Sequence, residues 1–385
     1  MSPPLDSSAA AGPRRRVAVL STRGFLNMRS HCAIHEMEDL LAEVEGARLL
    51  SPGRRGARGH GLAGAANRAL RKVGWQLSPT DRASALADEG PYDLLFVHSE
   101  SFGQLEQLDR AVKSWRELAP VRICRLEEVW SHWVDERHCR RLLRDFDAVS
   151  LGCAQSEAAL AAAIEAPVAY QPPAVDVARF TPASRPAPRP IDVLSLGRRP
   201  QRPHEALRRH ADAHPEFYYL FDTVVGNCPV TSSREHRDAY ADLVRRAKFF
   251  IVNPPKFNVP SHTRGQQEVG YRFFEGAAGG AVMLGEAPDC PTFDRLFGWP
   301  DAVVSLPQDT DDVSALMAEL RARDDELMQV RRRNVVETLR AHDWAHRWRD
   351  ILGMVDLRPT AALTQRLERL GTFADRHESG DSGAS

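Results

Sequence analysis

Short apolar runs alternate with longer segments of mixed polarity along most of the chain. Residues 17–20 (VAVL), 94–97 (LLFV) and 249–252 (FFIV) have the length and continuous hydrophobicity of strands buried on both faces. The segment after the first run carries apolar residues at helical spacing, including Leu40 and Leu41. Because buried strands that alternate with helices are typical of parallel sheets, the pattern predicts an α/β fold.

The same pattern predicts particular elements in the second half of the chain. Residues 217–224 and 247–255 are predicted as core strands, and residues 301–307 as an edge strand. Residues 311–340 have the amphipathic pattern of one long covering helix with an Arg-rich face. Beyond about residue 358 we expect one further helix and then a polar, disordered tail from His377.

Chain length and a proline-rich segment predict two domains. The 385 residues exceed the roughly 250–300 at which a single core stops growing. Residues 182–192 (PASRPAPRPID) have the composition of a stiff linker. We therefore expect two doubly wound Rossmann-like domains, a closing helix and a partly disordered tail, over residues 14–182, 183–340, 341–357 and 358–385 respectively.

Composition argues against several functional classes. With 51 basic and 52 acidic residues the net charge is −1, so the chain as a whole has no electrostatic preference for nucleic acid. The six cysteines show no CxxC pair and no metal-ligand spacing, which favours free thiols in a reducing cytoplasm. Residues 25–45 contain no GxGxxG motif and no GxxxxGK[ST] motif occurs in the chain, so neither a dinucleotide site nor a P-loop is predicted.

Residues 268–284 (EVGYRFFEGAAGGAVML) carry the strongest chemical signal. If a helix begins near Tyr271, Arg272 and Glu275 lie three residues apart on one face near its N-terminus, where backbone amides favour an anion. An Arg binds phosphate oxygens and a Glu accepts hydrogen bonds from sugar hydroxyls, so the arrangement suits a nucleoside diphosphate. The alternative is an ordinary i,i+3 ion pair on a solvent-exposed helix.

The segment RFFEGAAGGAVML resembles the donor-binding signature of group 1 glycosyltransferases of the GT-B architecture, where a Glu and a small-residue turn close an E-x7-E pattern. Glu275 takes the place of the second Glu. The first is expected at position 267, where this chain has Gln267 followed by Glu268. An Arg three residues before the Glu is closer to the spore-maturation-like branch of that family.

Other segments resemble the same family in the same order. Residues 175–182 (VDVARFTP) are similar to the end of its first domain, and Gly197-Arg198 to its glycine-arginine turn, whose Arg meets the diphosphate. Residues 342–351, which begin HDW and contain Arg347, Trp348 and Ile351, resemble its closing helix. The resemblance thus covers most of the chain and is most specific in the C-terminal half.

The resemblance implies a glycosyltransferase that moves a sugar from a nucleoside diphosphate sugar to an unknown acceptor nucleophile. It also implies retention at the anomeric carbon and no metal or other cofactor, with the acceptor held by the first domain and the donor by the second. Expected donor-binding residues are Gly197, Arg198, Lys256, Arg264, Arg272 and Glu275. Expected catalytic residues are His98, Glu127 and Glu268, and expected acceptor-side residues are Gly24, Glu100 and Trp130.

Alternatives stay open for several of these residues. The alternative for His98 is a helix-capping or core histidine, for Trp130 a core side chain, and for Lys256 and Arg264 ordinary solvated charges. The Gly-rich, basic residues 51–72 suit either a solvated excursion or a peripheral membrane contact. A catalytically silent nucleotide-sugar-binding protein and a nucleotide-sugar epimerase or phosphorylase on the same fold are the competing functions.

Overall fold

The computed structural model describes residues 15–23, 28–51, 91–112, 114–182, 188–224, 226 and 228–379. Two sheets organise these residues, and every strand pairing among them is parallel. The first sheet has the order β2-β1-β3-β4-β5-β6. Its strands are β1 (Val17–Leu20), β2 (Arg48–Leu50), β3 (Leu94–Ser99), β4 (Val121–Leu126), β5 (Ala148–Leu151) and β6 (Val168–Tyr170).

The second sheet has the order β11-β10-β9-β7-β8. Its strands are β7 (Ile191–Ser195), β8 (Tyr219–Phe221), β9 (Ala247–Val252), β10 (Val282–Gly285) and β11 (Val303–Ser305). In each sheet the first strand in sequence lies between the second and the third, so the strand order reverses between β1 and β3 and again between β7 and β9. Both sheets are therefore doubly wound.

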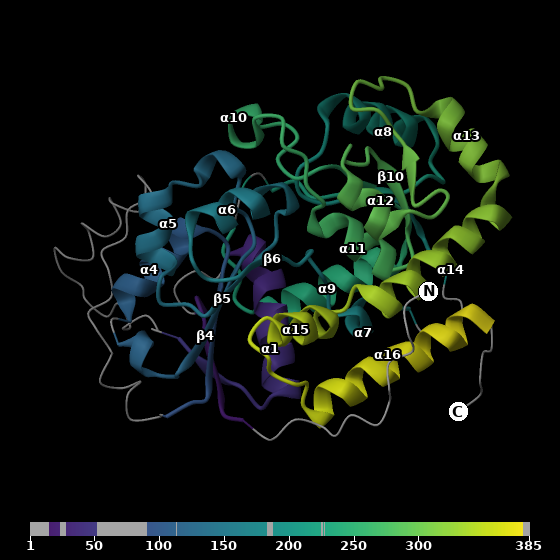
Figure 1. The fold of residues 1–385 in the computed structure, drawn as a ribbon. Helices are drawn as coiled ribbons and strands as arrows, with labels where there is room; N and C mark the ends of the chain where they lie inside the picture. The colour runs from purple at the N-terminus through teal and green to yellow at the C-terminus, as the bar shows by residue number, and fades with distance from the viewer. Residues whose placement is uncertain are drawn as a thin grey trace, which may run out of the picture.

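Helices cover both sheets and also connect them. The first part of the chain contributes α1 (Cys32–Val44), α4 (Phe102–Ala111), α5 (Glu136–Leu143), α6 (Glu157–Ala163) and α7 (Val177–Phe180). The second contributes α8 (Gln201–Ala213), α9 (Ser233–Arg245), α10 (Pro260–Thr263), α11 (Tyr271–Ala278), α12 (Pro291–Phe297), α13 (Ser314–Ala322), α14 (Asp324–Ala341), α15 (Trp344–Gly353) and α16 (Ala361–Ser379). In Figure 1 the blue helices α4 to α6 lie on one side of α1 and α9, and the teal helix α8 and the green elements α12 and β10 lie on the other.

The first sheet is buried on both faces, as its continuous apolar strands predict. Ala18 and Leu20 of β1 face one core cluster, and Val17 and Val19 face another. The second of these clusters is completed by Trp344 and Trp348 of α15. The end of the chain therefore returns to the half of the molecule built on the first sheet, called the first half below, as Figure 1 shows for α15 beside α1.

The predicted fold class is confirmed: the chain is an α/β protein of the GT-B architecture, with two doubly wound Rossmann-like units. The predicted helix start at Tyr271 and the edge position of the strand within 301–307 are also confirmed. The assignment of residues 217–224 to a core strand is wrong, because β8 is the edge of its sheet opposite β11.

Two helix predictions need correction. The segment 311–340 is not one helix, because α13 ends at Ala322 and α14 begins at Asp324. Three acidic residues occupy the first turn of α14, where they stabilise a new helix N-terminus. At the other end, α16 continues to Ser379, so the predicted disordered tail from His377 begins at least three residues too early. The β2 and β6 strands were not predicted, because most of their residues are only partly buried or exposed and give a weak apolar pattern.

Candidate active site

A cleft of about 480 Å³ lies between the two sheets at the carboxyl ends of their strands. Leu196 and Gly197 after β7 and Asn253 after β9 line its second-sheet side, at the point where the strand order reverses. Its first-sheet side is lined by residues that follow β3, β4 and β5, namely Glu100, Glu127 and Gly152. Ligands of doubly wound sheets bind at such reversal points, so this cleft is the first candidate for a functional site.

The N-terminus of α11 meets a glycine turn in this cleft. Gly197 has a φ of +83°, and a Cβ atom at this position would lie 3.0 Å from Nη2 of Arg272. The guanidinium group of Arg272, the second residue of α11, therefore lies directly against the turn that follows β7. A helix N-terminus has backbone amides without intrahelical partners, and an adjacent Arg adds a positive charge. This corner of the cleft consequently suits a phosphate group.

Glu275 also lines the cleft, but its carboxylate is already bound on both oxygens. Oε2 accepts hydrogen bonds from Nη1 of Arg272 at 2.7 Å and from the Tyr240 hydroxyl at 2.8 Å, and Oε1 accepts from Arg237. Burial opposes the charge, but the two arginines and Tyr240 outweigh it and lower the pKa of Glu275 to about 2. The i,i+3 pair with Arg272 thus exists, but it is part of a buried network rather than a solvent-exposed pair.

Glu127 is the corresponding buried carboxylate on the first-half side of the cleft. Its Oε1 lies 2.5 Å from both Nε2 of His98 and Nε of Arg125. Burial disfavours the carboxylate, but Arg125 and His98 outweigh it and lower the pKa of Glu127 to about 2. Glu127 faces the cleft, whereas His98 is fully buried behind it and is not among the residues that line the cleft. The structure therefore places His98 in contact with Glu127 rather than with a bound ligand.

Glu268 connects the two halves. Its carboxylate accepts hydrogen bonds from the backbone amides of Ala154 at 2.8 Å and Gln155 at 2.9 Å, both in the first half, and from Nε2 of Gln266 at 2.7 Å. Burial raises the pKa of Glu268, and these three hydrogen bonds partly offset the rise. Although Glu268 lines the cleft, its oxygens hold the first half against the loop before α11.

Three basic residues expected at the phosphates lie elsewhere. Arg198 is exposed, with Nη1 3.4 Å from the side-chain oxygen of Asn258. Lys256 forms an ion pair with the first half, with its Nζ 2.6 Å from Oε1 of Glu128. Arg264 caps the end of α10 in a left-handed conformation and is exposed. None of these three residues lines the cleft. Of the residues expected to bind the phosphates, only Gly197 and Arg272 lie at the N-terminus of α11.

The expected acceptor-side residues have mixed positions. Glu100 lines the cleft, and its Oε2 lies 2.9 Å from Nε2 of His31. Trp130 borders the cleft but is only 1% exposed and packs edge-on against Trp133, which favours the core-packing alternative. Gly24 lies outside the described residues, as does all of segment 51–72 except Ser51.

Several cleft residues were not found from the sequence. Arg29 reaches from the first half to Oδ2 of Asp222 at 2.9 Å, and Oδ1 of Asp222 accepts a hydrogen bond from the amide of Gly197 at 3.0 Å. Asp222 directly follows an apolar strand, which is a signal that could have identified it. His236 and Arg237 lie within the helix α9, and no neighbouring motif in the sequence marks them. They line the cleft only because of the way α9 packs.

A second hollow of about 620 Å³ lies beyond the ends of β9 to β11, outside the cleft. The described residues that line it include Glu286 and Asp289 and no basic side chain, so it does not suit a diphosphate. Within the part of the chain that the structure describes, no group of three or more His, Cys, Asp and Glu side chains could hold a metal ion. The helices of that same part include none with the length and apolarity needed to cross a bilayer.

Comparison with solved structures supports the fold. The N-terminal domain of a trehalose-6-phosphate phosphatase from Candida albicans gives a TM-score of 0.52 at 10% identity, over 91% of this chain and 98% of that domain. A glycosyltransferase from Rickettsia africae gives 0.48 at 9% identity, over 89% of this chain and 100% of that chain. Staphylococcus aureus MnaA in a co-structure with UDP gives 0.43 at 9% identity, over 90% and 99%. Of these three structures only the Candida domain has a TM-score above 0.5, and at 10% identity it shows a shared fold alone.

Among curated proteins, none matches this sequence. Residues 201–353, which run from α8 to the end of α15 and include β8 to β11, match a family described as glycosyl transferase-like. The matched region contains Arg272 and Glu275 and supplies most of the second-half wall of the cleft. The family match supports glycosyl transfer as the general activity of this chain, whose C-terminal part is similar to glycosyl transferases.

Proposed function

We propose that this chain is a glycosyltransferase that takes a sugar from a nucleoside diphosphate sugar and passes it to an acceptor hydroxyl or another nucleophile. The donor is held mainly by the second domain, residues 183–340, and the acceptor by the first, residues 14–182. The observation that carries this proposal is the contact between Arg272 and the Gly197 turn at the N-terminus of α11, because it forms an anion site at the strand reversal of the second sheet.

The shape of the cleft supports a particular orientation of the donor. From the phosphate corner the cleft extends along α9, where Ala239, Tyr240 and Leu243 present apolar surface together with Leu196. A planar nucleobase fits such a surface, and the ribose then lies over Tyr240 and Glu275. The sugar projects in the opposite direction, toward Glu127 and Glu100 of the first half. This orientation places the anomeric carbon between the two domains.

The reaction follows from the charges around that position. The bond between the anomeric carbon and the diphosphate oxygen breaks, the oxygen keeps the electron pair, and the acceptor oxygen forms the new bond. Arg272 and the amides of α11 stabilise the charge that develops on the diphosphate, which requires no metal. Loss of one such contact typically costs about 3–4 kcal/mol in the barrier. Glu127, held ionised by Arg125, stabilises positive charge at the anomeric carbon.

Retention at the anomeric carbon is part of the proposal and rests on the family resemblance. It is supported by the state of Glu127 and Glu275, whose carboxylates are bound by arginines and have a lowered pKa, which makes them poorly suited to remove a proton. In a same-face displacement the acceptor proton leaves on the departing diphosphate. The Arg three residues before Glu275 supports placement in the spore-maturation-like branch, and six free cysteines support a cytoplasmic location.

A thermal-shift panel with UDP, GDP, TDP and ADP tests the donor site. A ligand at a hundred times its Kd adds about 2.7 kcal/mol to the free energy of unfolding, which raises Tm measurably. We expect one nucleotide to stabilise the wild type but not Glu275→Ala. Glu286→Ala, which removes a carboxylate from the second hollow, should keep the response.

The outcomes separate the competing functions. If no nucleotide raises Tm of the folded wild type, the donor site is refuted. If one does, the matching nucleotide sugars are incubated with a library of acceptors and the release of free nucleoside diphosphate is measured. Binding without any release over water alone would favour the catalytically silent alternative.

A further inference from the structure

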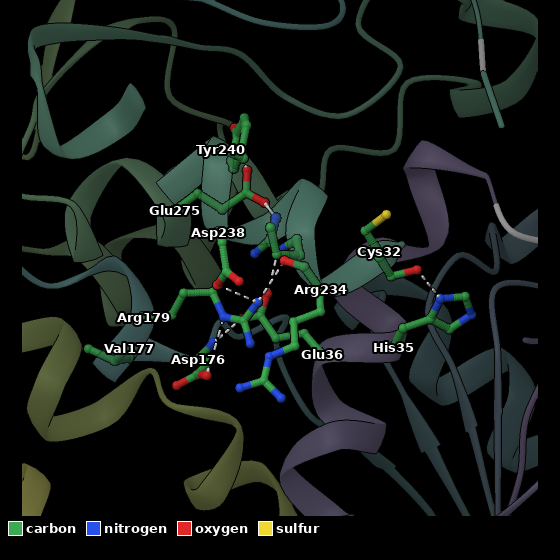
Figure 2. Close-up of polar contacts among 12 residues, drawn as sticks. Cys32, His35, Glu36, Asp176, Val177, Arg179, Arg234, Asp238, Tyr240 and Glu275 are labelled. Carbon is green, nitrogen blue, oxygen red and sulfur yellow. Dashed lines mark hydrogen bonds and ion pairs between the residues drawn. The ribbon is translucent and has the colours of Figure 1, made fainter. Parts of the chain in front are cut away.

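A buried relay of alternating charges connects the first half of the molecule to the donor corner. Glu36 of α1 binds Nε of Arg237 on α9, and Nη1 of Arg237 binds Glu275 of α11, which in turn binds Arg272. Glu36, Arg237 and Glu275 are 2%, 4% and 2% exposed, so this charge relay is buried up to Arg272, which opens onto the cleft. Figure 2 shows Glu36 on the purple helix facing the teal helix that carries Asp238 and Tyr240, with Glu275 beyond.

Arg237 is held from several directions at once. Besides its two carboxylate partners, its guanidinium carbon lies 4.7 Å from the ring centre of Phe180 in α7. Its Nη2 is buried and has no hydrogen-bond partner among the described residues. Removing one partner of such a group leaves a buried charge under-compensated, so Arg237 depends on both carboxylates staying in place.

Glu36 also binds the segment that crosses between the two sheets. Its Oε1 accepts a hydrogen bond from the backbone amide of Asp176, the residue before α7. Asp176 is in turn bound by Arg366 of α16 at 2.7 Å, and the next amide, of Val177, donates to Asp343 at 2.9 Å. Glu36 therefore touches the crossing segment and the donor-side helix α9 at the same time, although it does not line the cleft.

We propose that Glu36 and Arg237 are positioning residues through which the acceptor half controls donor binding. The proposal rests on the proposed function, because the donor site is its readout. A ligand that fills the cleft binds the arrangement in which the two halves are together. The Glu36–Arg237 contact stabilises that arrangement and at the same time orients Glu275, which holds Arg272. Weakening the contact should lower donor affinity even though no atom of Glu36 reaches the ligand.

Glu36→Gln is the direct test, and α1 offers a matched control. Arg237 and the Asp176 amide donate to different oxygens of Glu36, and Gln replaces one of these oxygens with an NH2 group, which then faces a donor instead of accepting from it. Glu38 lies on the same helix, is also fully buried and binds Ser21 and Arg23 within its own half at 2.7 Å each. Glu38→Gln therefore removes a comparable buried charge without touching the second half.

The affinity of each protein for the nucleoside diphosphate that stabilises the wild type, chosen from UDP, GDP, TDP and ADP, is measured by calorimetry well below its melting temperature. We expect Glu36→Gln to raise Kd about tenfold, within the roughly 5- to 150-fold range of coupled sites. Glu38→Gln should stay within about twofold of the wild type. If the two residues act through the same site, the double variant Glu36→Gln/Arg272→Met should raise Kd by less than the product of the two single increases.

Equal Kd values for Glu36→Gln and Glu38→Gln, or a double variant whose effect equals the product of the single effects, would overturn the proposal. If Glu36→Gln does not fold, Arg237→Lys takes its place, because Lys keeps the charge but cannot bind two carboxylates as a fork. A Kd for Arg237→Lys within twofold of the wild type would overturn the proposal equally. A wild type that binds none of the four nucleotides would instead refute the proposed function, so the two failures are distinguishable.

Discussion

Gly197→Ala separates the backbone strain of the turn from its contact with Arg272. At a φ of +83° an Ala residue costs roughly 1–2 kcal/mol relative to its preferred conformations. Gly265 has a φ of +84°, and no described residue lies within 4 Å of the position that its Cβ atom would take, so Gly265→Ala should carry the same strain without a steric contact. Gly265 also lines the second hollow and not the cleft, which makes it a matched control.

The two variants should differ in ligand binding. At position 197 the added Cβ would lie 3.0 Å from Nη2 of Arg272, which is tighter than an ordinary van der Waals contact, so the guanidinium must move by a few tenths of an ångström. The end of an Arg side chain moves at little cost in stability. A hydrogen bond to a charged group, however, contributes about 1.5–3 kcal/mol, and its loss raises Kd roughly ten- to hundredfold.

Urea denaturation and calorimetric titration with the nucleoside diphosphate give the two quantities independently. We expect both variants to lose about 1–2 kcal/mol of unfolding free energy and only Gly197→Ala to lose affinity. If Gly197→Ala binds the nucleotide as tightly as Gly265→Ala does, Arg272 does not contact the phosphates from its position against the turn. The reasoning from that contact would then be refuted.

Further predictions concern single charges. Arg272→Met should weaken nucleotide binding at least tenfold, whereas Arg264→Met, which removes an exposed charge outside the cleft, should change Kd less than twofold in the same titration. Lys256→Met should change Kd less than about fivefold, because its partly exposed ion pair with Glu128 contributes about 1 kcal/mol at most; a larger change would place Lys256 on the ligand. The pKa of Glu127 lies at about 2 instead of 4.5, so its ionisation stabilises the fold above about pH 4.5, and this stabilisation is lost as the pH falls toward 2. Glu127→Gln should therefore cost about 3 kcal/mol at pH 7 in urea denaturation, with the difference from wild type shrinking below about pH 4.5. A difference independent of pH would show that the carboxylate is not held ionised by Arg125 and His98.

The sequence was sufficient where one local pattern determines one element. The start of α11 at Tyr271 and the strand before Gly197 follow from turns and apolar runs that need no tertiary information. The sequence could not show which of Arg198 and Arg272 enters the cleft, because both lie next to or near a glycine in segments that resemble the family motifs. Only the path of the backbone decides which guanidinium enters the cleft, and the left-handed turn at Gly197 exposes Arg198 to solvent while admitting Arg272.

The ion-pair partners of the buried charged residues could not be predicted from the sequence either. His98 and Glu127 were both expected at strand ends facing a ligand, but β3 and β4 pair with His98 opposite Arg125. This register places the three side chains together, so the histidine is bound by the carboxylate in front of it. Arg237 had no motif at all, and its role depends on α1 and α9 packing against each other across the two halves.

The charges of the cleft explain why a site rich in carboxylates can still hold a diphosphate. Six acidic side chains of the described residues line it, and each has a partner: Glu100 with His31, Glu127 with Arg125, Glu128 with Lys256, Asp222 with Arg29, Glu268 with backbone amides and Glu275 with Arg237 and Arg272. Two of the cations, Arg29 and Lys256, come from the opposite half of the molecule. If the halves separated, Glu128 would lose Lys256 and Asp222 would lose Arg29 but keep Arg199, so each wall of the cleft would carry less compensated negative charge and attract a diphosphate less well. Donor affinity should therefore depend on the two halves being together, for electrostatic reasons as well as steric ones.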